Sequence, residues 1–94
     1  MKNLNALITN LENNAKSDWA IEEGMASMYI QDAKDATIIL KFITNPFGES
    51  MVNFVKASEY LNTLDTSIRE GICMAIADDE GNDFLQENFG WSIK

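Results

Sequence analysis

The chain has 94 residues, a length that suits one domain built around a single core. Hydrophobic residues make up 46% of it and charged residues 23%, close to the globular average, so the composition excludes general disorder. The net charge of −8 disfavours direct binding to nucleic acid or to anionic membranes. The absence of histidine disfavours most hydrolase chemistry, which relies on a histidine base.

The sequence also bears on location. No segment approaches the roughly 18 consecutive apolar residues that a membrane-spanning helix needs, and no basic flank followed by an apolar run marks a leader. The one cysteine, Cys73, cannot form an internal disulfide and has no histidine to activate it, so we expect a packed core thiol. We therefore expect a single cytoplasmic domain over residues 1–94, a monomer or a homodimer.

The first predicted element is an amphipathic helix over residues 3–16 with Asn3 as its N-cap. Its apolar positions recur at helical spacing and are Leu4, Leu7, Ile8, Leu11 and Ala15. The next segment, 17–24, is ambiguous, because Trp19 and Ile21 alternate as in a short strand whereas Asp18 could cap a helical turn. We expect this segment to be irregular.

A β-hairpin is predicted next. Residues 25–31 alternate, 32–35 interrupt the pattern, and 37–43 are rich in β-branched side chains. The cluster Asn45-Pro46-Phe47-Gly48 predicts a reversal. Residues 51–57 then alternate as a third strand, although their spacing also fits a helix.

A long helix capped by Ser58 is predicted to follow, with the stripe Leu61, Leu64, Ile68, Ile72, Ala75 and Ile76. Gly71 weakens it and indicates a close contact. A last helix is predicted from Asp83 to Phe89, capped by Asn82 and ended by Gly90. The predicted fold class is therefore α+β: an N-terminal helix, a three-stranded antiparallel meander, and a long and a short helix packed on one face of the sheet.

Acidic residues dominate the end of the chain, since residues 58–94 hold eight acids and two bases. The densest cluster has no base and consists of Asp78, Asp79, Glu80, Asp83 and Glu87. A calcium-binding EF-hand loop starting at Asp78 fails, because it needs glycine where Asp83 stands and glutamate where Phe89 stands. We expect no metal and no cofactor. The alternative for this cluster is a solvated connection between two helices, with its acids at the N-terminus of the last one.

Three further residues could extend the cluster into a partner-binding surface. Glu59 and Glu70 are 11 residues apart, about three helical turns, so on one helix they would point the same way. Trp91 follows the cluster, and tryptophan is enriched in binding hot spots. The alternative for the nearby Phe84 and Phe89 is that they dock the last helix on the core.

These features favour a non-enzymatic acidic binding protein. Spaced carboxylates can imitate nucleic-acid phosphates and occupy a basic groove, so the leading hypothesis is an inhibitor or decoy that covers the basic, nucleic-acid-binding surface of another protein. Small proteins of phages or mobile elements that act against host defences often work this way. The alternatives are an immunity or antitoxin protein for a basic toxin, and a structural or adaptor subunit that docks through a strand edge or through Trp19 and Trp91, its charge serving only solubility.

Overall fold

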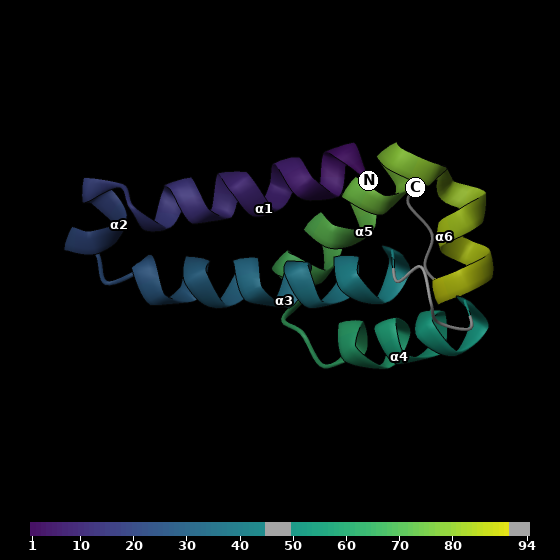
Figure 1. The fold of residues 1–94 in the computed structure, drawn as a ribbon. Helices are drawn as coiled ribbons and strands as arrows, with labels where there is room; N and C mark the ends of the chain where they lie inside the picture. Colours follow the sequence, from purple (N-terminus) through teal and green to yellow (C-terminus); the bar gives the residue numbers. More distant parts are fainter. Residues whose placement is uncertain (45–49, 91–94) are drawn as a thin grey trace.

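The computed structural model describes residues 1–44 and 50–90, with residues 50–53 described by their backbone alone. These residues form α-helices and no strand (Figure 1), so the predicted α+β class with its three-stranded meander is wrong. The helices in chain order are α1 (Lys2–Ala15), α2 (Asp18–Glu22), α3 (Ala26–Thr44), α4 (Ser50–Asn62), α5 (Thr66–Glu80) and α6 (Asn82–Phe89). The predicted reversal at 45–48 lies outside the described residues.

Helix α1 confirms the first predicted element. Its apolar stripe is buried at Leu4, Ile8, Leu11 and Ala15, while Leu7 packs at the margin of the core. The N-cap is Met1 rather than Asn3. The segment predicted to be irregular contains α2, because the Ser17 side chain accepts a hydrogen bond from the Ala20 amide at 3.2 Å and caps a short helix.

Helix α3 replaces the predicted hairpin of residues 25–43. The side chains that face its neighbours recur every three or four residues along the whole segment, and they are Tyr29, Ala33, Ala36, Leu40 and Ile43. The predicted turn at 32–35 lies in the middle of this stripe. Two buried alanines there leave room for α1 to approach α3 closely.

The β-branched residues of α3 made the strand prediction attractive, but they are tolerated in the helix. Each lowers helix propensity by at most about 0.7 kcal/mol relative to alanine, whereas full burial of a side chain such as Ile39 contributes roughly 1.5–3 kcal/mol. The Thr37 and Thr44 hydroxyls donate hydrogen bonds to the carbonyls of Ala33 and Leu40, both at 2.7 Å, and so remain satisfied inside the helix. Packing therefore outweighs local propensity.

The predicted third strand and long helix are also corrected. Residues 51–57 belong to α4, which continues past Ser58, so Ser58 is not a cap. The stripe expected on one helix is divided between α4 and α5, because the chain leaves helical conformation after Asn62 and resumes with Asp65 as the N-cap of α5. The stripe residues are nevertheless buried or half-buried, with Leu61 on α4, Leu64 in the connection and the others on α5.

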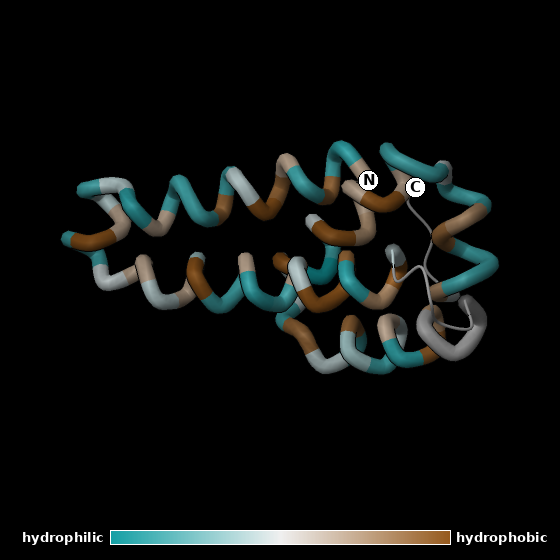
Figure 2. The backbone as a smooth tube through the Cα atoms, in the orientation of Figure 1, coloured by the Kyte–Doolittle hydropathy of each residue, from teal (hydrophilic) through white to brown (hydrophobic). Residues whose placement is uncertain are grey.

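The helices assemble around one core. Figure 1 shows α1 and α3 side by side and antiparallel, joined through α2 at one end of the molecule. At the other end α5 packs on α1, α4 packs on α3, and α6 contacts both α4 and α5. Hydrophobic and hydrophilic positions alternate with helical period along α1 and α3 (Figure 2). The largest fully enclosed side chains are Leu4, Ile39, Leu61, Ile72, Ile76 and Leu85.

Helix α6 agrees with its prediction almost to the residue. It ends at Phe89, and Gly90 follows in the left-handed conformation at φ 70°, as expected for a glycine that terminates a helix. Its first residue is Asn82, and Gly81 takes the N-cap position that was predicted for Asn82.

Candidate protein-binding surface

The predicted acidic cluster lies on α5 and α6, where most of its carboxylates are exposed. We call this surface the acidic face and define it as Glu70, Asp78, Glu80, Asp83 and Glu87. The sequence contains no lysine or arginine between Glu70 and Gly90. Spacings of four residues place Glu70 and Asp78 on one side of α5, with the exposed Met74 between them, and Asp83 and Glu87 on one side of α6.

Asp79 differs from its neighbours because its carboxylate is engaged within the protein. Oδ1 accepts hydrogen bonds from the Asn3 backbone amide at 2.7 Å and from Asn3 Nδ2 at 3.0 Å, while Oδ2 accepts one from the Leu4 amide at 3.0 Å. Partial burial tends to raise the pKa of Asp79, but these hydrogen bonds and the N-terminal ammonium outweigh it and hold the pKa below its usual value.

These hydrogen bonds make Asp79 the cap of α1. Met1 supplies no side-chain cap and the first turn of α1 contains no acid, so a carboxylate from the end of α5 satisfies two of its free amides. An acid at the C-terminal end of its own helix would ordinarily be unfavourable. Asp79 is tolerated at the end of α5 because its carboxylate caps α1. The same contact fixes the part of α5 that carries Asp78 and Glu80.

The other predicted binding residues are more scattered. Glu59 is exposed on α4 and Glu70 on α5, so the expectation that these two residues share one helix and point the same way is wrong. Lys56, three residues before Glu59, is also exposed and offsets its charge. Trp91 lies outside the described residues.

The aromatic residues of α6 serve the core. Phe84 and Phe89 both meet Phe54 of α4 edge to face, with ring centroids 5.5 Å and 5.8 Å apart. Phe89 is buried and Phe84 half-buried. They dock α6 on α4 and thereby hold Asp83 and Glu87 in place on the opposite side of α6.

A polar cluster around the buried carboxylate of Asp35 connects α3 and α4, and sequence reasoning missed it. Asp35 is buried, and its Oδ1 accepts hydrogen bonds from the Tyr60 hydroxyl at 2.6 Å and from Gln31 Nε2 at 3.0 Å. Nearby, burial and then the charges of Asp35 and Asp65 raise the pKa of Asp32. A helical reading of residues 26–44 would have placed Asp35 on the buried side, and the strand interpretation concealed it.

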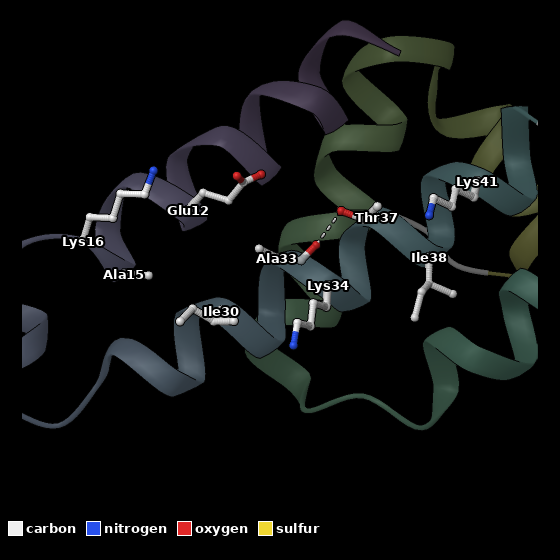
Figure 3. Close-up of a pocket in the computed structure, with 9 residues that line it drawn as sticks. All are labelled: Glu12, Ala15, Lys16, Ile30, Ala33, Lys34, Thr37, Ile38 and Lys41. Carbon is white, nitrogen blue, oxygen red and sulfur yellow. Dashed lines mark hydrogen bonds between the residues drawn. The ribbon is translucent and has the colours of Figure 1, made fainter.

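An open groove lies between α1 and α3. It was not predicted from the sequence, because residues 25–43 were expected to form a hairpin. It encloses about 550 Å³ (Figure 3). Its lining combines apolar side chains with three lysines and one acid and consists of Glu12, Ala15, Lys16, Ile30, Ala33, Lys34, Thr37, Ile38 and Lys41. Almost half of the cationic side chains of this acidic chain, three of seven, therefore border one groove.

The remaining chemistry is limited. Cys73 is buried as predicted. Burial raises the pKa of its thiol to about 11; the charge of Arg69 opposes this shift and that of Glu70 adds to it. The thiolate is therefore scarce at neutral pH. Within residues 1–44 and 50–90 no three Cys, Asp or Glu side chains are grouped as a metal site would require. Across the same residues, no helix has both the length and the apolar character needed to cross a bilayer.

The chain was compared with protein-family models, with curated proteins and with solved structures, and none of the three comparisons gave a match.

Proposed function

We propose that this chain is a non-enzymatic binding protein of the cytoplasm, whose acidic face covers the basic, nucleic-acid-binding surface of another protein. The observation that carries the proposal is the acidic face: five exposed carboxylates on two adjacent helices, in a stretch of sequence without a cation. Such a surface attracts basic proteins and repels nucleic acid.

The charge distribution supports the acidic face over the rest of the molecule. Helices α1, α3 and α4 each contain equal numbers of acids and bases. Helices α5 and α6 together carry six acids and one base, whereas α2 carries two acids, so the largest concentration of negative charge lies on α5 and α6. A partner approaching this end meets carboxylates in several orientations, as it would on a nucleic-acid backbone.

The rigidity of the acidic face also supports the proposal. Asp79 ties the end of α5 to α1, and Phe84 and Phe89 tie α6 to α4. Carboxylates on fixed helices lose less conformational entropy on binding than carboxylates on a mobile tail. The complex is held mainly by ion pairs at its rim, so its affinity falls as salt is added.

The test is capture of the partner from the lysate of the native host, followed by competition. The bound protein should be released by high salt and by added duplex or single-stranded nucleic acid, because the decoy and the nucleic acid that it imitates would bind the same site. The double reversal Asp83→Lys and Glu87→Lys should abolish capture. Asp79 must be left intact in this variant because it caps α1.

The matched control reverses two exposed carboxylates on α1 and α2, Glu12→Lys and Asp18→Lys, with the same change in net charge. Full capture by the control and none by the α6 variant assigns the site. Equal loss in both variants, or binding that nucleic acid does not displace, would refute the proposal.

A second candidate is an adaptor that docks through α2. It is favoured by Trp19 and Ile21, which are 56% and 61% exposed on this short helix. The strand edge considered for an adaptor does not exist in the described residues. An adaptor of this kind predicts capture that resists salt and is lost in Trp19→Ala but not in the α6 double variant.

A further inference from the structure

The α2 end of the molecule exposes apolar side chains among acids. Trp19 and Ile21 are both exposed on α2, and a hydrophobic segment (brown) is visible there in Figure 2. The acids around them are exposed as well, at Asp18, Glu22 and Glu23. We call these five residues the α2 tip. It combines an apolar centre with a negative rim.

The groove between α1 and α3 has the opposite rim. Lys16, Lys34 and Lys41 border it, and among the described residues none of these lysines forms an ion pair. Ile30 and Ile38 contribute apolar surface, and Ile30 is 47% exposed. The rim has a net charge of two positive units, because Glu12 offsets one lysine.

The position of the groove leaves it accessible. Figure 1 shows α4, α5 and α6 gathered at the end of the α1/α3 pair that is remote from α2. Figure 3 shows the lining side chains arranged along α1 and α3, from Lys16 and Ile30 near α2 to Lys41 in the last turn of α3. An apolar surface of this kind, bordered by lysines, is suited to an acidic apolar segment.

We propose that the occupant of the groove is the α2 tip of a second copy of this chain. The charges are complementary, since three carboxylates would meet a rim of two positive units, and the exposed Trp19 and Ile21 would gain the cover that they lack in one copy. The sizes agree. Ile30 and Lys41 are 11 residues apart, about 16 Å along α3, whereas the five residues of α2 rise about 7.5 Å.

Reciprocal docking closes the assembly as a dimer. Each copy carries both the tip and the groove, so a two-fold axis pairs the tip of each with the groove of the other and produces two equal contacts. The acidic face stays outside this interface, because α5 and α6 lie at the opposite end from α2 (Figure 1). The dimer therefore stands independently of the function proposed for the acidic face, and it would present two acidic faces; it would cover the α2 surface that the adaptor candidate requires.

Charge reversal on the full chain tests the dimer in solution. Wild-type protein should sediment as a dimer whose fraction falls on dilution. A groove variant, Lys34→Glu with Lys41→Glu, and a tip variant, Glu22→Lys with Glu23→Lys, should each dissociate at about tenfold higher concentration or more, because like charges then face each other in both contacts.

Mixing the two variants is the decisive measurement. In the mixture the acidic groove of one variant meets the basic tip of the other, and the unchanged acidic tip of the first meets the unchanged basic groove of the second. Both contacts are then complementary, so a heterodimer should form. This rescue separates loss of the interface from loss of folding. The matched control, Lys2→Glu with Lys56→Glu, reverses two exposed lysines outside the groove and should dimerise like the wild type.

Three results would overturn the dimer. One is a wild-type protein that stays monomeric at every concentration. Another is a pair of folded variants that do not associate when mixed. The third is a groove that binds an acidic peptide or an anionic amphiphile while Trp19→Ala leaves self-association unchanged, which would assign the groove to a different occupant.

Discussion

The hydroxyl of Tyr60 in α4 donates a 2.6 Å hydrogen bond to Oδ1 of Asp35, a buried carboxylate in the middle of α3. The two residues are 25 positions apart in the sequence, and their hydrogen bond connects α3 to α4. A buried acceptor that loses its donor retains the cost of its desolvation. This bond is therefore a specific determinant of how α4 sits on α3.

Replacement of Tyr60 by phenylalanine keeps the ring and removes the donor. Asp35 would retain its hydrogen bond from Gln31 and lose the shorter one, so we expect the free energy of unfolding to fall by about 1–3 kcal/mol. Urea denaturation measures the change. Tyr60→Phe combined with Asp35→Leu should recover part of the loss, because no unpaired carboxylate remains, and a double variant less stable than Tyr60→Phe would contradict this account.

The same bond predicts a high tyrosine titration. The hydrogen bond to Asp35, followed by burial, raises the pKa of Tyr60 to about 12. Because the folded pKa exceeds the unfolded value of about 10, this stabilisation is complete below pH 10 and is lost as the pH rises toward 12. The difference in tyrosinate absorbance between wild type and Tyr60→Phe isolates this one side chain. A midpoint near pH 10 in folded protein would refute the bond.

The parts of the fold that sequence could predict are those in which local pattern and burial agree. The stripe from Leu4 to Ala15 has an uninterrupted helical period. Gly90 marks the end of α6, because glycine readily adopts the positive φ with which helices often end. In α3 the local sequence pattern and the burial pattern disagree. Its β-branched residues favour strand locally, whereas contacts of Ala33 and Ala36 with distant helices favour helix, and those contacts are invisible in a single sequence.

A substitution at Lys34 distinguishes the helix from the predicted hairpin. Lys34 is exposed, and it lies within the segment that was predicted to be a turn. In the interior of α3, Lys34→Pro removes a hydrogen bond and introduces a clash, so we expect a loss of about 3 kcal/mol or more. Lys34→Ala, the control, should change stability little. A proline variant as stable as the alanine variant in thermal unfolding would favour the turn.

The candidate site was predictable in composition but not in role. Charge counting located the acidic cluster, yet Asp78 and Asp79 are adjacent residues of the same type, and nothing in the local sequence assigns them different roles. What separates them is the direction of each side chain at the end of α5, where Asp79 meets the start of a helix that lies 75 residues earlier. No local pattern contains that contact.

This difference predicts opposite effects at neighbouring positions. Asp79→Ala removes the cap of α1 and should destabilise the protein by about 1 kcal/mol, within the range of roughly 0.5–2 kcal/mol for helix N-caps. Asp78→Ala removes an exposed negative charge from the C-terminal end of α5, so its effect should be neutral or slightly stabilising. Equal losses in the two variants would mean that Asp79 does not act as a cap.

The contribution of Asp79 should also depend on pH. Its pKa is lowered in the folded protein, so its stabilisation is complete above the unfolded pKa of about 3.9 and is lost as the pH falls through the lower folded value. The stability difference between wild type and Asp79→Ala should thus be constant near neutral pH and shrink in acid. Denaturant unfolding at several pH values measures it, and a difference that grows below pH 4 would contradict the assignment.

Two glycines give a matched pair that tests the packing of α5 and the end of α6. A Cβ at Gly71 would lie 4.0 Å from Leu7 Cδ2, an ordinary contact, so Gly71→Ala should fit against α1 and stabilise the helix by about 0.5–1 kcal/mol. Gly90 is different because its φ of 70° strains any side chain, although the space around it is open. Gly90→Ala should therefore destabilise the protein by about 1 kcal/mol. Thermal unfolding of both variants gives the signs, and a destabilised Gly71→Ala would mean that α5 and α1 approach more closely than the Leu7 contact indicates.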